Sequence, residues 1–211
     1  MSQIKVLLIE DDPDWIKAMT AFLNKEEDLL IVGAATRAAE AIELAKTVAF
    51  DVLLLDIQLS ENNLEGIYLA AEIHDIHPAK IIMLTSLIDP HVMTQAFTAG
   101  AMQYVEKENF RELPYTIRNA YHHPSAMEAL LTEFSRLKRE EQLQSLTTAE
   151  REVFELIEEG YTQSQIKKKL YKAESTLKNQ VNTMLKKLGV KSSKEAVEKV
   201  RRKGLVNKKN Q

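Results

Sequence analysis

Short, unbroken apolar runs alternate with amphipathic segments over the first 122 residues, and this alternation constrains the fold more than any other feature. The runs lack the period-two pattern of half-exposed strands, as expected for parallel strands that are buried on both faces. The predicted strands are Ile4–Ile9, Leu29–Gly33, Val52–Leu55, Lys80–Thr85 and Gln103–Val105. The predicted helices contain Ile16, Met19, Phe22 and Leu23 on one face of the first, and lie near Ala38–Thr47, Gly66–His74, Pro90–Ala99 and Phe110–Tyr121 for the others. Such alternation predicts right-handed βαβ units, and therefore an α/β domain with a doubly wound parallel sheet.

Charged and polar side chains follow the carboxyl ends of four predicted strands. Glu10 and Asp11 follow the first strand, Asp56 the third, Thr85 ends the fourth, and Lys107 follows the fifth. Ligands of open α/β sheets bind at these ends, so we expect the five side chains in one crevice. Several carboxylates with a lysine and a hydroxyl predict an Mg²⁺ site that also receives a phosphate oxygen. In this interpretation Asp56 is an oxygen nucleophile for phosphorus, and Lys107 and Thr85 bind the transferred phosphoryl group.

The acidic run continues beyond Asp11, but its later members are expected to serve a helix. Asp12 precedes Pro13, a residue that suits the first helical position, so Asp12 is predicted to be an N-cap. Asp14 then lies in the first turn, where the helix dipole favours an acid. The run is therefore interpreted as two carboxylates for a metal ion and the remainder for the helix.

The charge of the chain reverses in its last third. Residues 146–211 hold 16 Lys and Arg against 8 Asp and Glu, whereas residues 1–145 hold 12 against 23, so the net charges are +8 and −11. This asymmetry indicates an acidic module joined to a basic one, and a basic module is a candidate for nucleic-acid binding. Residues 123–145 are expected to form a helical linker between them, with its polar stretch at Lys138–Ser145.

The basic module is predicted to be wholly helical. Thr147 with Glu150 and Thr162 with Gln165 form two capping boxes, and Gly160 is placed to end the first helix. A third helix is expected near Glu174–Leu188 and a fourth near Ser193–Arg202. A helix, a short turn and a second helix with a basic face are typical of a helix-turn-helix DNA reader.

The first module resembles response-regulator receiver domains over about residues 3–122. The resemblance rests on Glu10-Asp11, Asp56 after Val52–Leu55, Thr85 in Ile81–Ser86, and Tyr104–Lys107. It implies a flavodoxin-like, five-stranded parallel sheet and phosphoryl transfer from a histidine kinase phosphohistidine to Asp56. It also implies Mg²⁺ held by Asp11, Asp56 and the main-chain carbonyl of Gln58, with Glu10 acting mainly through water. Tyr104 matches the switch aromatic that follows the movement of Thr85.

The loop after Asp56 departs from the receiver pattern. Receivers commonly carry Met-Pro-Gly there, whereas this chain has the longer, polar segment Ile57–Gly66. We expect an altered loop geometry and an altered lifetime of the phosphoryl group, with Gln58 as a candidate for orienting an attacking water.

The second module resembles the NarL/LuxR-type effector domain over about residues 146–205. The resemblance rests on Leu146–Val153, Gly160, Glu174–Val181 and Lys187–Val190. It implies a small all-α domain whose third helix enters the major groove. The implied base or nearby phosphate contacts are Lys178, Asn179, Gln180 and Asn182, and the phosphate candidates are Lys168, Lys186 and Lys191.

Three residues of the turn before the third helix differ from that family's pattern. Lys167 stands where alanine is common, and Lys172 where an apolar residue usually packs. Ala173 is a weaker N-cap than the usual serine. The sequence leaves open a looser turn or a helix that begins later, with Ser175 as its cap.

These resemblances predict a transcriptional response regulator of a two-component phosphorelay. The implied partners are a sensor histidine kinase, double-stranded promoter DNA, a second copy after phosphorylation, and RNA polymerase. Two alternatives remain: a receiver-like regulator that works without phosphorylation, and a haloacid-dehalogenase-like phosphatase. The second alternative lacks its general acid, because Gln58 replaces the second Asp. The absence of a signal-peptide layout, of a membrane-spanning apolar run and of cysteine favours a cytoplasmic protein. The regulator interpretation further implies a protein that is not an enzyme.

Overall fold

The computed structural model describes residues 3–59, 64–86, 89–123, 125–203 and 205, which fall into two compact units. The first ends at Glu133 and the second covers Phe134–Val206. The first unit contains the strands β1 (Ile4–Ile9), β2 (Leu29–Ala35), β3 (Val52–Asp56), β4 (Lys80–Thr85) and β5 (Ala101–Glu106). Its helices are α1 (Pro13–Leu23), α2 (Ala38–Thr47), α3 (Glu65–Ile76), α4 (Pro90–Thr98), the 3₁₀ helix η1 (Lys107–Glu112) and α5 (Leu113–His122).

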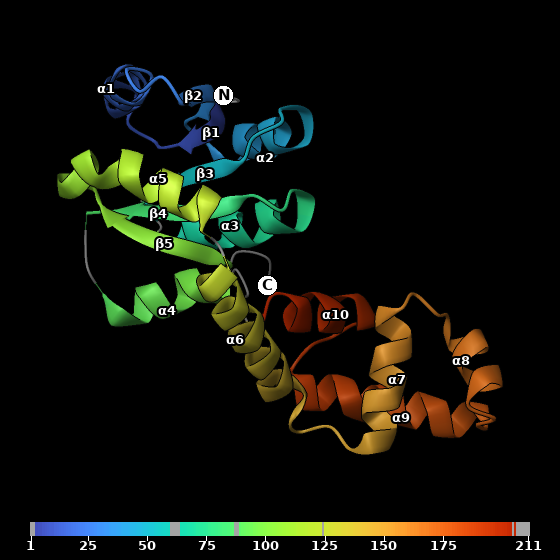
Figure 1. Cartoon of the computed structure of the whole chain (residues 1–211). Helices are drawn as coiled ribbons and strands as arrows, with labels where there is room; N and C mark the ends of the chain where they lie inside the picture. The colour runs from blue at the N-terminus through green and yellow to red at the C-terminus, as the bar shows by residue number, and fades with distance from the viewer. Residues whose placement is uncertain (1–2, 60–63, 87–88, 124, 204, 206–211) are drawn as a thin grey trace. The chain divides into compact units, whose positions relative to one another are not determined.

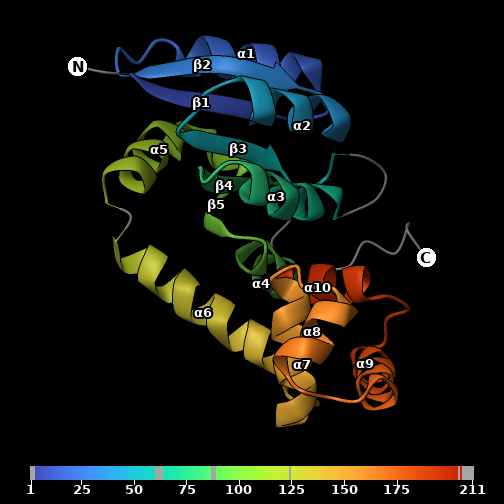
Figure 2. The same ribbon diagram turned by 90° about the vertical axis from the view of Figure 1, so that its right-hand side faces the viewer.

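The five strands form one parallel sheet in the order β2-β1-β3-β4-β5 (Figure 1). This is the flavodoxin-like order, in which the connections change direction between β1 and β3. Helices α1 and α5 cover one face, where Met19, Leu23, Leu113 and Ile117 join strand residues in one apolar core. Helices α2, α3 and α4 cover the other face, as the turned view in Figure 2 also shows. The predicted doubly wound sheet is confirmed.

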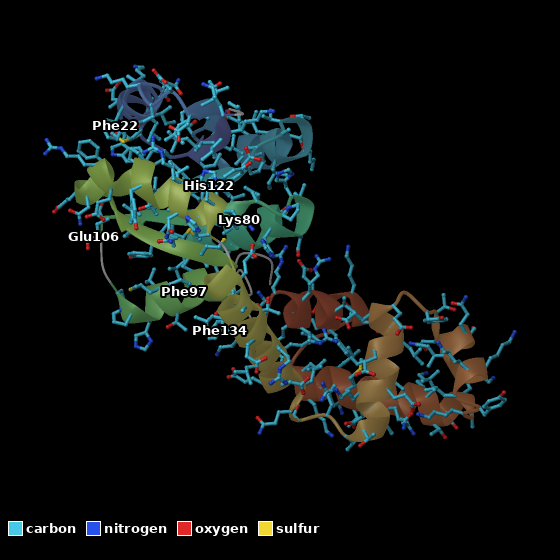
Figure 3. All side chains as sticks on the ribbon, viewed as in Figure 1. Phe22, Lys80, Phe97, Glu106, His122 and Phe134 are labelled. Carbon is cyan, nitrogen blue, oxygen red and sulfur yellow. The ribbon has the colours of Figure 1, made fainter. Side chains whose placement is uncertain are left out.

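Local signals explain where the first unit's helices begin. Asp12 caps α1 as predicted, because its carboxylate accepts from the Asp14 and Trp15 N–H groups and Pro13 opens the helix. The helix expected from Phe110 starts instead as η1, and α5 begins only at Leu113. The reason is Pro114, which fits the first turn of a helix but would remove a hydrogen bond from its interior. Phe110 still packs edge-on against Phe22 of α1, which is labelled in Figure 3, and the ring centroids of the two residues lie 5.3 Å apart.

A single helix, α6 (Ser125–Leu143), covers most of the expected linker. Near its start, Glu128 forms an ion pair with Lys80 of β4, which is labelled in Figure 3. Near its end, Arg139 donates to both carboxylate oxygens of Glu158, at 2.7 and 2.6 Å. Leu143 is buried with the core of the second unit.

The second unit is helical after α6, with α7 (Thr148–Glu158), α8 (Gln163–Lys169), α9 (Glu174–Leu188) and α10 (Ser193–Arg201). Both predicted capping boxes are present, at Thr147 with Glu150 and at Thr162 with Gln165. The core contains the fully buried Phe154 and apolar residues from every one of these helices. Within the described residues, none of the helices is both long and apolar enough to cross a lipid bilayer.

Candidate functional site

The carboxyl ends of β1 and β3 bring three carboxylates together. Glu10 follows β1 and is wholly buried, Asp56 ends β3 and is 2% exposed, and Asp11 beside them is exposed. Each offers an oxygen that lies within 4.8 Å of the others. The Asp12 N–H also donates to Glu10 at 3.3 Å, which fixes the side of the carboxylate nearest α1. Residues 46 positions apart along the chain therefore form one acidic cluster at the switch point of the sheet.

Lys107 offsets the repulsion within this cluster. It lies just beyond β5, and its Nζ is 2.7 Å from Glu10 Oε2 and 2.9 Å from Asp56 Oδ2. The ammonium group also lies 5.4 Å from the centroid of the Trp15 ring on α1, in cation–π contact. Side chains from β3, from α1 and from the residue after β1 thus hold the Lys107 ammonium group against the carboxylates of Glu10 and Asp56.

Burial and the contacts between Glu10 and Lys107 have opposing effects on the pKa of each residue. Burial raises the pKa of Glu10 to about 7, even though hydrogen bonding to Lys107 lowers it. Burial works against the charged form of Lys107, but its hydrogen bonds to Glu10 and Asp56 outweigh this and raise its pKa. Lys107 therefore stays protonated near neutral pH, and Glu10 is the group of the pair that gains or loses a proton there.

Thr85 and Tyr104 lie on neighbouring strands beside the acidic cluster. Thr85 ends β4 and is 2% exposed, whereas Tyr104 of β5 is half-buried. Burial raises the pKa of the Tyr104 hydroxyl, which shares a hydrogen bond with Thr85. A hydroxyl at the site is therefore linked directly to an aromatic side chain nearer the surface.

The segment after Asp56 begins with two defined contacts. The Gln58 N–H donates to Asp56 Oδ1 at 3.2 Å, and the Ile57 N–H donates to the Leu84 carbonyl at 3.0 Å. The part of the longer loop at 60–63 lies outside the described residues. Gln58 itself is half-buried next to the carboxylate.

Gly66 supports the site in a way that the strand and helix patterns do not reveal. It lies in the first turn of α3, and its N–H donates to the Ile57 carbonyl at 3.0 Å. A Cβ atom on this residue would stand 1.9 Å from the Asp56 carbonyl oxygen. Glycine is therefore required for α3 to approach the end of β3. The sequence does not predict this approach, because residues 57–64 separate the two elements.

The acidic cluster fits a hard divalent cation. All three ligand groups are oxygens, and the exposure of Asp11 leaves one side of the cluster open to water. Mg²⁺ prefers oxygen ligands and keeps several of its waters, so a site with one open side suits it. An added positive charge would also offset the negative charge of Asp56 and Glu10, which Lys107 alone offsets only in part.

Helix α9 of the second unit has one apolar face and one exposed polar face. Leu177, Val181, Met184 and Leu188 are buried, at the spacing of a single helical stripe. Lys178, Asn179, Asn182 and Lys186 are exposed on the opposite side. Gln180 lies at the flank between the two faces, where its Oε1 atom is buried without a hydrogen-bond partner. The predicted DNA contacts are therefore exposed, with Gln180 the least accessible of them.

The unusual residues of the turn between α8 and α9 do not delay the start of α9. Helix α9 begins at Glu174 with Ala173 as its N-cap and no side-chain capping bond, so the later start with a Ser175 cap is wrong. Lys167 donates to Glu174 at 3.1 Å, which adds an ion pair across the turn. The Lys172 Nζ atom is buried and lies 3.6 Å from Glu152 of α7. The long stem of Lys172 thus occupies the place of an apolar residue.

The remaining phosphate candidates surround α9. Lys168 of α8 and Lys191 after α9 are exposed, as is Lys186. Lys187, which is not among the predicted phosphate contacts, donates to Glu150 at 2.6 Å and ties the end of α9 to the start of α7. Lysines on α9 therefore divide into those that hold the domain together and those that face outward.

Known families match both units. Residues 6–118 match the family described as "Response regulator receiver domain", and residues 144–200 match "Bacterial regulatory proteins, luxR family". The structure is similar to that of RcsB from Salmonella typhimurium (TM-score 0.52, 22% identity, 94% of this chain and 98% of that one), a likeness of fold alone. The receiver domain of Thermotoga maritima CheB covers 56% of this chain and 96% of its own length, with a TM-score of 0.52 and 27% identity.

Full-length relatives carry the same pair of domains. The transcriptional regulatory protein LiaR of Bacillus subtilis is 32% identical over 97% of this chain and 100% of its own length. DesR of the same organism is 30% identical over 95% and 98%. The DNA-binding transcriptional activator DevR/DosR of Mycobacterium tuberculosis is 30% identical over 92% of each chain. This chain therefore belongs to the two-component response regulators that join a receiver domain to a LuxR-type DNA-binding domain, and it is a transcriptional regulator rather than an enzyme.

Proposed function

We propose that Asp56 is the phosphoacceptor and that its phosphorylation controls DNA binding by the second domain. The observation that carries this proposal is the carboxylate of Asp56, almost fully buried at the end of β3 with Lys107 at 2.9 Å and two further carboxylates beside it. The donor is a phosphohistidine of a sensor histidine kinase. Its P–N bond breaks as an O–P bond to Asp56 forms, and the released imidazole takes up a proton.

Glu10, Asp11, Asp56 and the main-chain carbonyl of Gln58 would hold Mg²⁺. The bound ion supplies charge neutralisation for the phosphoryl oxygens. Lys107, held by Glu10 and Asp56 in the resting protein, turns to pair with the phosphoryl group. Thr85 donates a hydrogen bond to the same group, and its existing contact with Tyr104 transmits the change toward the surface around α4. Gln58 remains a candidate for orienting a water that later removes the phosphoryl group.

We propose that α9 enters the major groove. Lys178, Asn179 and Asn182 would reach base edges or nearby phosphates, and Gln180 would do so after its side chain moves out. Lys168, Lys186 and Lys191 would contact phosphates. Phosphorylation would favour a homodimer that reads two half-sites, and the DNA-bound dimer would act on RNA polymerase. The receiver domain would cover residues 1–122, the helical linker 123–145 and the DNA-binding domain 146–211.

Substitutions of Asp56, which ends β3, and of Asp51, which precedes it, test the assignment of the phosphoacceptor. The chain is incubated with Mg²⁺ and a small-molecule phosphodonor, and intact-mass spectrometry counts the phosphoryl groups. The wild type is expected to gain one group and Asp56→Asn none. Asp51, which accepts from the Lys5 N–H at 2.8 Å at the other end of β3, provides the matched control, and Asp51→Asn should label like the wild type. Equal labelling of Asp56→Asn would reject the assignment, and an unlabelled wild type would favour a phosphorylation-independent regulator.

A further inference from the structure

Three turns of the DNA-binding unit end a helix with the same backbone motif but not with the same residue. At each, the N–H of a residue with positive φ donates to the carbonyl three residues back, and the next N–H donates to the carbonyl five residues back. After α7 this residue is Gly160 (φ 89°), and after α9 it is Gly189 (φ 66°). After α8 it is Tyr171, with φ 51°. Left-handed backbone disfavours side chains with a Cβ atom, so tyrosine is the unfavourable choice there.

Nothing that Tyr171 contacts among the described residues compensates for this conformation. Its side chain is 96% exposed, so the ring gains almost nothing from burial. Among the described residues it has no ring partner and no side-chain hydrogen bond. Tyr161, the other tyrosine near the turn, differs because Lys169 lies 4.2 Å from its ring centroid. An exposed, strained residue that does not stabilise the fold is a candidate for contact with a ligand.

The surroundings of Tyr171 indicate what that ligand is. The last turn of α8 carries Lys167, Lys168 and Lys169, and Lys172 follows. Lys167 and Lys172 face Glu174 and Glu152, and Lys169 covers Tyr161. Lys168 is exposed and, within the described part of the chain, has no ion-pair partner. It precedes Tyr171 by three residues, so a cation and a phenol hydroxyl are left at the turn to receive an anion.

The position of the turn selects the phosphate backbone of DNA. The turn leads directly into α9 (Figure 1). The start of a recognition helix lies at the major groove, which is bordered by the phosphate backbone. Tyrosine hydroxyls are common donors to phosphate oxygens. We infer that Tyr171 is a DNA-backbone contact whose hydroxyl donates to a phosphate beside Lys168, and that tyrosine is kept at this left-handed position for binding rather than for folding. The inference rests on the proposed placement of α9 in the major groove.

The test measures folding and DNA binding on the same variants of the full chain. DNA affinity is measured by fluorescence anisotropy with a labelled, mixed-sequence duplex over about 50–200 mM salt. Tyr171→Phe removes only the hydroxyl and is expected to weaken binding about tenfold, as for loss of a hydrogen bond to a charged group. Because the hydroxyl is neutral, the slope of log K against log salt should not change. Lys168→Ala should instead reduce that slope by about 0.9.

Stability separates a binding role from a structural one. Tyr171→Gly should weaken DNA binding at least as much as Tyr171→Phe, while its urea midpoint, followed by circular dichroism of the helices, stays equal to or above that of the wild type. The matched control is Tyr115→Phe, because Tyr115 of α5 is 73% exposed but lies on the receiver domain. Tyr115→Phe should bind DNA like the wild type.

The outcomes distinguish this inference from the proposal on which it rests. If Lys178→Ala weakens binding but Tyr171→Phe binds as tightly as the wild type, the phosphate contact is overturned and the α9 assignment stands. If neither variant weakens binding, the placement of α9 fails as well. A lower urea midpoint for Tyr171→Gly would show that Tyr171 serves the fold, and this too would overturn the inference.

Discussion

A methyl group added at Gly66 should damage the fold and the candidate site together. In Gly66→Ala the new Cβ would lie 1.9 Å from the Asp56 carbonyl oxygen, 2.8 Å from Ile57 Cα and 2.9 Å from Asp56 C. Real Cβ atoms essentially never come closer than 3.0 Å to such atoms, so α3 and the end of β3 must separate by at least 1.1 Å. All three neighbours are backbone atoms, and no side-chain rotation can relieve the contact.

The expected loss of stability follows from two opposing effects. Overpacking of this kind costs about 3 kcal/mol, at the upper end of its range because backbone must move. Replacing glycine by alanine in a helix returns about 1 kcal/mol through helix propensity. The net loss is about 2 kcal/mol, which lowers the urea midpoint by about 1 M for an m-value of about 2 kcal/mol/M. A displacement of this size at Asp56 should also slow phosphorylation by about 100-fold.

Trp15 and Gly33 supply the assay and the control. Trp15 is the single tryptophan of the chain and packs against the receiver core, so its fluorescence follows unfolding of that domain. In Gly33→Ala the nearest atom would be the flexible end of Leu7, Cδ1 at 3.1 Å, so this variant should unfold at or slightly above the wild-type midpoint. Equal midpoints for Gly66→Ala and Gly33→Ala would refute the steric reasoning.

Two further predictions concern the charges of the site. The pKa of Glu10 is raised from 4.5 to about 7 on folding, so the folded state binds more protons than the unfolded state between these pH values. The stability of the receiver domain without Mg²⁺ should therefore fall as pH rises from about 4.5 to 7. Urea midpoints should show this pH dependence in the wild type but not in Glu10→Gln, and a parallel dependence in both proteins would contradict the prediction. Lys107→Ala leaves two buried carboxylates without their cation, so at pH 7.5 in EDTA it should lower the free energy of unfolding by about 3 kcal/mol. Millimolar Mg²⁺ should then raise the urea midpoint of Lys107→Ala more than that of the wild type. An equal Mg²⁺ effect on both proteins would show that Lys107 and the metal do not neutralise the same carboxylates.

The sequence predicts those parts of the fold that local rules determine. Ile4–Ile9 and Lys80–Thr85 are strands with the expected bounds, because buried parallel strands read as unbroken apolar runs. The two capping boxes mark the starts of α7 and α8, because each pairs groups only three residues apart. The observed bounds differ from the predicted ones where a second local rule applies. Pro114 must lie in the first turn of a helix, so α5 begins at Leu113 rather than at the predicted Phe110.

The parts that the sequence does not predict depend on distances between elements. Glu10, Asp56 and Lys107 could be assigned to one crevice from sheet topology, but the cation–π contact of Lys107 with Trp15 depends on how α1 packs. The requirement for Gly66 arises from the approach of α3 to β3, although residues 57–64 separate the two elements in the sequence. Likewise, the periodicity of α9 separates Lys178 from the core, but only the packing of neighbouring helices shows that Gln180 has a buried oxygen.

Local rules are broken at the acidic cluster and at Tyr171, and at each of these places we propose a function. Glu10 and Asp56 are carboxylates inside an apolar sheet, and Lys107 only partly offsets the cost of burying them. Tyr171 occupies a backbone conformation that glycine adopts in the two matching turns. Such departures persist when they serve something other than the fold. Replacing Tyr171 should therefore reduce DNA binding without reducing stability, whereas replacing Gly66, which obeys the steric rule of its position, should reduce both stability and the rate of phosphorylation.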